Sequence, residues 1–132
     1  MSYKNTFIVI SEDSSVSSAI VPAPKKGKIT IASIEYDLIS NHPYEYTQED
    51  VQLKTYLMKN QIDRETEELR EEFFSKPKAC FRVSPLVKKY GWGIHYDEEG
   101  KIALYDVSSL DYERLSKTED IKVLKGMRTS RK

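Results

Sequence analysis

The sequence predicts an α+β fold, in which a small antiparallel sheet that includes a hairpin over residues 92–106 has helices packed on one face. Two observations support this prediction. Asp97-Glu98-Glu99-Gly100 fits a type I turn followed by a left-handed glycine, which is the common three-residue hairpin loop. Elsewhere, apolar residues recur at helical spacing after residues that favour the N-terminal caps of helices. Because 132 residues is a usual size for one core, we expect a single globular domain over residues 1–132.

The first forty residues predict a strand, a long loop and a helix. The apolar run from Phe7 to Ile10 indicates a short strand over residues 6–11. Residues 12–28 are rich in serine, proline and lysine and predict a long loop, which is either a functional flap or hides a further element. Residues 29–40 present apolar side chains on one helical face, so a helix is favoured over the alternative of a strand.

Capping signals predict two further helices. Thr47, with Asp50 three residues later, indicates the start of a helix that continues through Met58. Asp63 predicts the cap of the next helix, whose outer face carries a run of glutamates. We interpret this run as a solvated face, because no histidine accompanies it, and we expect neither a bound metal nor a cofactor. The glutamates are Glu65, Glu67, Glu68, Glu71 and Glu72.

A strand and a short helix are predicted before the hairpin. Residues 79–83 show the alternation of a half-buried strand. Ser84-Pro85 is typical of a helix start, since proline favours the first helical position, and Gly91 suits the left-handed residue after the end of that helix.

The register of the hairpin follows from counting outward from its turn, and it separates two faces. The core face carries Trp92, Ile94, Tyr96, Ile102 and Leu104. The other face carries Gly93, His95, Ala103 and Tyr105. The imidazole and the phenol should therefore lie side by side over a glycine gap. If residues 79–83 form the neighbouring strand, Arg82 joins them, and the three groups would suit a carboxylate or a phosphate. The alternative is that a helix covers this face and that His95 is hydrogen-bonded there and has no role in binding.

Two capped segments and a basic tail complete the chain. Ser108 and Thr118 each resemble a cap, and the second segment should stop at Gly126. Residues 127–132 predict a mobile basic tail. Residues 1–72 contain 8 Lys or Arg and 13 Asp or Glu, whereas residues 73–132 contain 13 and 8. This asymmetry either helps the halves dock or directs an anionic partner to the second half.

The motif between residues 84 and 101 resembles the signature of an uncharacterised family of small bacterial proteins, a domain of unknown function. The residues that carry this resemblance are Ser84-Pro85-Leu86, Lys88, Tyr90-Gly91-Trp92-Gly93-Ile94-His95, Asp97 and Gly100-Lys101. The likeness extends to residues 6–8, 41–44 and 47–51, and so covers nearly the whole chain. It implies a compact bacterial protein of the cytosol and implies no activity, cofactor or partner.

Composition and motifs favour a small cytosolic binding or interaction domain with an anion-binding site. The early apolar run is too short for a membrane span or a signal peptide. The single cysteine excludes an internal disulfide, and no zinc spacing is present. The expected partner is a small anionic ligand or a protein. The candidate ligand-binding residues are Arg82, Lys88, Trp92, His95 and Tyr105.

Two alternatives remain open at this point. The first is a small enzyme in which Cys80 is the nucleophile and His95 the base, with Arg82 favouring the thiolate. The second is a weak nucleic-acid binder that uses the basic C-terminal half. The sequence contains no nucleophile elbow and no glycine-rich phosphate loop.

Overall fold

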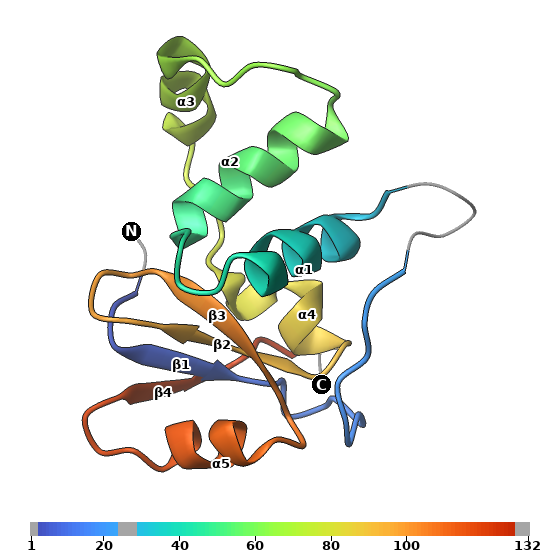
Figure 1. The fold of residues 1–132 in the computed structure, drawn as a ribbon, viewed down its shortest axis with the longest axis vertical. Coiled ribbons are helices and arrows are strands. Elements are labelled where there is room, and N and C mark those ends of the chain that lie inside the picture. Colours follow the sequence, from blue (N-terminus) through green and yellow to red (C-terminus); the bar gives the residue numbers. More distant parts are fainter. Residues whose placement is uncertain (1–2, 24–28, 129–132) are drawn as a thin grey trace.

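The computed structural model describes residues 3–23 and 29–128 and confirms the α+β fold (Figure 1). One four-stranded sheet has the strand order β3-β2-β1-β4. Its strands are β1 (Thr6–Val9), β2 (Trp92–Tyr96), β3 (Ile102–Asp106) and β4 (Lys122–Lys125). β2 and β3 are the two arms of the predicted hairpin, and β1 pairs antiparallel with β2.

The hairpin has the predicted register. Gly93 faces Tyr105 and His95 faces Ala103 across the two strands. Gly100 has a φ of 83°, as the three-residue loop requires, and the Asp97 amide donates to the carbonyl of Lys101 at 2.8 Å. The turn chemistry of four residues therefore fixes which side chains lie on each face of the sheet.

The fourth strand is β4, and the prediction of a strand over residues 79–83 is wrong. β4 pairs in parallel with β1, so the sheet is mixed rather than purely antiparallel. Residues 81–83 instead form a short 3-10 helix, η1 (Phe81–Val83). The Phe81 amide donates to Oε1 of the Gln48 side chain rather than to a strand. The alternation over residues 79–83 thus reflects a turn packed on the core. The segment predicted to follow a cap at Thr118 contains the strand β4.

Capping boxes start the two long helices, the second at the predicted cap and the first two residues after its predicted start. α1 (Ile31–Asn41) begins after Thr30, and α2 (Gln48–Lys59) begins after Thr47, whose hydroxyl accepts from the Asp50 amide. α3 (Glu67–Phe74) starts after Thr66 and not after Asp63. Its acidic side chains face solvent, and none of its residues is buried.

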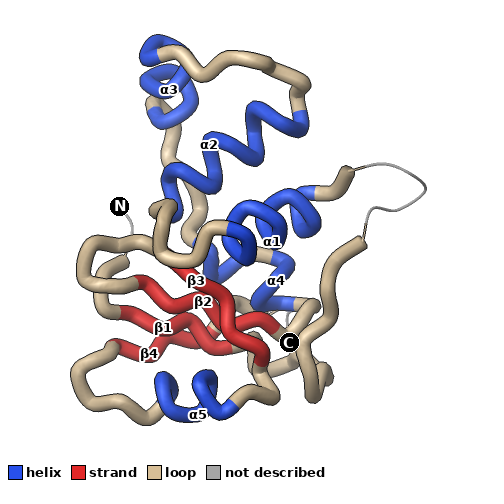
Figure 2. Tube along the Cα trace, viewed as in Figure 1, coloured by secondary structure: helices blue, strands red, loops and turns tan. Residues whose placement is uncertain are grey.

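Helices cover both faces of the sheet, which corrects the prediction of helices on one face. α1 and the short α4 (Pro85–Lys88) pack on the face that carries Ile8, Ile94 and Tyr96, and α2 packs on α1. α5 (Leu110–Ser116) lies on the opposite face, where its Tyr112 ring packs on Phe7 at 5.0 Å between ring centres. Figures 1 and 2 show α5 across the sheet from α1. α5 starts after Ser109, one residue later than predicted.

The long loop is held against the hairpin over the part that the structure describes. Residues 12–23 contain no helix or strand, and residues 24–28 of the predicted loop lie outside the described ranges. The Trp92 indole donates to the carbonyl of Ile20 at 2.9 Å, and the Ala19 amide donates to the Asp106 carboxylate at 3.0 Å. Gly91 has a φ of 78° and packs closely against this loop.

Residues 127–128 of the predicted basic tail are in contact with the domain. The Met127 amide donates to the Arg82 carbonyl, and Arg128 pairs with Glu12 at 2.9 Å. Residues 129–132 lie outside the described ranges, so the predicted mobility of the tail stays a prediction. Within residues 3–23 and 29–128, no helix has the length and apolar content needed to cross a membrane.

Candidate functional site

The hairpin face predicted from the sequence carries a hydrogen-bonded cluster of His95, Tyr105 and a residue that the prediction missed, Tyr44. The Tyr44 hydroxyl lies 2.8 Å from Nδ1 of His95 and 2.6 Å from the Tyr105 hydroxyl. Tyr44 has a φ of 59°, and its amide donates to the Ile102 carbonyl at the edge of β3. The loop between α1 and α2 thereby brings Tyr44 around the sheet edge onto the α5 face.

The His95 imidazole of this cluster is uncharged near neutral pH. Burial lowers the pKa of the His95 imidazole below its usual value, despite the nearby charge of Asp97. Burial and the hydrogen bond with Tyr105 raise the pKa of Tyr44 above its usual value. A neutral imidazole offers an anion no charge, so we interpret the cluster as a polar bridge between the loop and the sheet. Anion binding there stays a prediction.

The other predicted site residues lie elsewhere. Nε of Arg82 donates to the Lys125 carbonyl at 2.6 Å, beside β4. Lys88 is on α4, and the Trp92 ring packs against Tyr36 on the face opposite His95. For Arg82 the physical reason is the sheet order, because β1, and not residues 79–83, occupies the place next to β2.

Cys80 and His95 also lie on different sides of the sheet. The Tyr3 hydroxyl donates to Sγ of Cys80 at 3.2 Å, and the Tyr3 ring packs edge-on against Tyr96. Tyr96 belongs to the α1 and α4 face, whereas its neighbour His95 points to the α5 face. The structure therefore does not bring together the predicted nucleophile and base.

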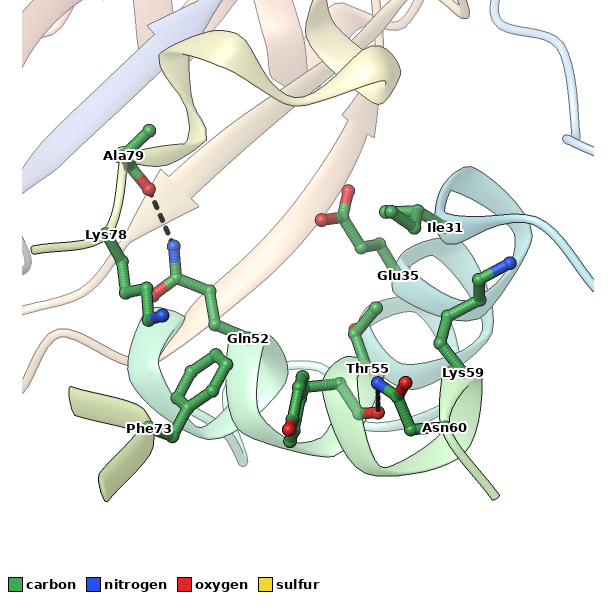
Figure 3. Close-up of a pocket in the computed structure, with 10 residues that line it drawn as sticks. Ile31, Glu35, Gln52, Thr55, Lys59, Asn60, Phe73, Lys78 and Ala79 are labelled. Atoms are coloured by element: carbon green, nitrogen blue, oxygen red, sulfur yellow. Dashed lines mark hydrogen bonds between the residues drawn. The ribbon is translucent and has the colours of Figure 1, made fainter. Parts of the chain in front are cut away.

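A pocket of about 420 Å³ lies between α1, α2, α3 and the segment that precedes η1 (Figure 3). Apolar side chains and polar groups both contribute to its wall. The residues that line it are Ile31, Glu35, Gln52, Thr55, Tyr56, Lys59, Asn60, Phe73, Lys78 and Ala79.

Glu35 is the buried acid of this pocket. It is only 7% exposed, and Ser84 Oγ donates to its Oε1 at 2.8 Å. Burial raises the pKa of the Glu35 carboxyl to about 7, although the Ser84 hydrogen bond acts in the opposite direction. The carboxyl therefore changes its charge near neutral pH, as few carboxyl groups in proteins do.

Two lysines provide the positive charges of the pocket wall. Nζ of Lys78 lies 4.1 Å from the centre of the Phe73 ring, and Nζ of Lys59 donates to the Ile29 carbonyl at 3.3 Å. Figure 3 shows Lys59 and Lys78 on different sides of the pocket, with the Glu35 carboxyl between them. The Gln52 amide ties α2 to the wall by donating to the Ala79 carbonyl at 2.7 Å.

Sequence reasoning missed this pocket, although one signal for it was present. Glu35 shares the apolar stripe of α1 with Ile31, Ile34 and Leu38, where an acid is unusual. The remaining wall comes from segments that meet only in the tertiary structure. No group of three or more His, Cys, Asp or Glu side chains in the described residues could hold a metal ion.

A comparison with protein-family models matches the whole chain, residues 1–132, to a family of unknown function, DUF6157. Neither a curated protein nor a solved structure matches it. The resemblance expected from the hairpin motif is thus confirmed at the level of a family of unknown function. The chain belongs to the DUF6157 family.

Proposed function

We propose that this protein is a binding domain for a small organic anion with an apolar body, and that the ligand occupies the pocket beside Glu35. The observation that carries the proposal is a buried glutamate, only 7% exposed, in the wall of a cavity that also has two ammonium groups. Buried ionisable groups in a cavity are typical of functional sites, because burial of their charge is costly.

The size and the apolar walls of the pocket favour a small organic molecule. A volume of about 420 Å³ falls within the usual range for small-molecule sites. Ile31 is 49% exposed and Tyr56 is 38% exposed, although both are large apolar side chains of its wall. A ligand with an apolar body would cover this surface and remove it from water, which stabilises the complex.

The charges of the wall favour an anion over a cation. Lys59 and Lys78 carry two positive charges, and Glu35 is the single acid among the lining residues. With its pKa at about 7, Glu35 offsets at most part of that charge at neutral pH. The expectation of a small anionic ligand is therefore kept, and its proposed place moves from the hairpin face to this pocket.

The test adds benzoate, as the probe, to the ¹⁵N-labelled protein. Binding is measured from the changes in the amide chemical shifts. We expect saturable shifts for the amides of Gln52 and Thr55, and weaker binding in the Lys59→Gln/Lys78→Gln double variant. Lys88→Gln/Lys89→Gln is the matched control, because it removes the same charge from the C-terminal end of α4 and its cap, outside this pocket. Absence of pocket shifts, or an equal loss in the control, would contradict the proposal.

A further inference from the structure

The hydrogen bonds around Glu35 decide which of its oxygens faces the ligand. The Ser84 hydroxyl accepts from the Leu86 amide at 3.2 Å and donates its own proton to Oε1 of Glu35. Oε1 therefore acts as an acceptor. Oε2 has no hydrogen-bond partner among the described residues, and Glu35 lines the cavity. When Glu35 is protonated, its proton consequently sits on Oε2 and is available to a molecule in the pocket.

We propose that the ligand is a monocarboxylate whose carboxylate group accepts a hydrogen bond from the protonated Glu35 side chain, so that protein and ligand share one proton. This inference rests on the proposed function of the pocket, and it adds the class of ligand and the proton that accompanies it. Two carboxyl groups in close contact hold one proton between them, because two adjacent negative charges repel each other.

A carboxylate suits this site better than the other common charged groups. A hydrogen bond from a carboxyl to a carboxylate is short and charge-assisted, and it is stronger than one between neutral groups. A phosphate would bring up to two charges against a side chain that is 93% buried, at a larger desolvation cost. An amine would require Glu35 to be ionised and would be repelled by Lys59 and Lys78.

Ligand affinity should then depend on pH through Glu35. Two ionisable groups line the pocket with Glu35: Lys59 of α2 and Lys78 of the segment before η1. A third, Tyr96 of β2, is close enough to interact electrostatically with Glu35. From the N-terminus of α4, the group that contacts Glu35 is the Ser84 hydroxyl. Burial raises the pKa of Tyr96 above its usual value, so its phenol stays protonated over this range. Affinity should therefore be constant below the pKa of Glu35, about 7, and fall about tenfold for each pH unit above it.

The experiment measures the dissociation constant of benzoate at several pH values between 6 and 9, with inorganic phosphate as a comparison probe. For the natural protein we expect the benzoate constant to rise on the order of a hundredfold over this range. Glu35→Gln should bind benzoate with an affinity that does not change with pH, because the amide still accepts from Ser84 and donates to the ligand. Asp37→Asn is the matched control, an exposed acid on the same helix, and it should keep the natural pH dependence.

A calorimetric measurement on the natural protein tests the same inference without any variant. At pH 8, titrations with benzoate in buffers of different ionisation enthalpy should report the uptake of close to one proton for each ligand bound.

The outcomes separate the two proposals. Benzoate binding without proton uptake, an affinity constant from pH 6 to 9, or an unchanged pH dependence in Glu35→Gln overturns the shared proton but leaves the binding domain standing. Phosphate that binds more tightly than benzoate overturns the carboxylate class. Absence of benzoate binding even at pH 6 contradicts both proposals.

Discussion

The buried acid Glu35 should make the stability of the ligand-free protein depend on pH, and replacing it by glutamine should remove that dependence. Burial raises its pKa from 4.5 to about 7 in the folded state. Below pH 4.5 the carboxyl is protonated in both states and does not oppose folding. As the pH rises, the unfolded chain releases the proton first, so the folded state loses stability until the pH exceeds about 7.

The size of this effect follows from the two pKa values. A tenfold change in a proton-binding constant corresponds to about 1.4 kcal/mol, so the difference between 4.5 and about 7 corresponds to about 3 kcal/mol. Glu35→Gln keeps an acceptor for Ser84 and has no proton to lose. The variant should therefore gain about 3 kcal/mol of unfolding free energy relative to the natural protein between pH 4 and pH 8.

Urea denaturation at pH 4, 6 and 8, followed by the fluorescence of the single tryptophan, Trp92, measures this difference. Other groups titrate in both proteins, so the comparison of variant with natural protein isolates Glu35. Asp37→Asn, on the same helix but exposed, should follow the natural protein much more closely. Parallel stability curves for Glu35→Gln and the natural protein across this range would refute the reasoning.

Three further predictions concern the fold around the sheet. Gly93→Ala should lower the unfolding free energy by about 1–3 kcal/mol, because its Cβ would lie 2.7 Å from ring atoms of Phe7 and Tyr112; an unchanged urea midpoint would contradict this close packing. The His95 imidazole should titrate below its usual pKa of 6.5 in an NMR experiment, since burial disfavours its charged form, and a normal or raised value would show an open environment. Thr47→Ala removes the cap of α2 and should cost about 1 kcal/mol, which thermal or urea unfolding measures; no loss would mean that the capping box is dispensable.

The elements that the sequence predicted correctly are those whose signals are local. The hairpin register depends on the turn at residues 97–100 alone, and the start of α2 depends on Thr47 and Asp50. The positions of His95 and Tyr105 on one face followed from this register. Apolar and polar residues do alternate over residues 79–83, where the predicted strand is wrong. The backbone of this segment hydrogen-bonds to a side chain of α2, which no local pattern could reveal.

The candidate pocket was beyond sequence reasoning because its groups come from separate segments. Glu35 and Lys59 belong to different helices, and Lys78 follows a third. The burial that shifts the pKa of Glu35 exists only after these helices pack. An acid on an apolar helical stripe was the one available sign, and it does not say what else surrounds the carboxyl.

The α+β class, the cap of α2 and the two faces of the hairpin follow from the sequence, because these depend on backbone preferences of residues that are close in the chain. The tertiary structure alone decided that β4 joins β1, that Tyr44 reaches His95 around the sheet edge, and that Glu35 is enclosed between helices. The physical reason is that pairing, burial and charge environment depend on contacts between distant residues.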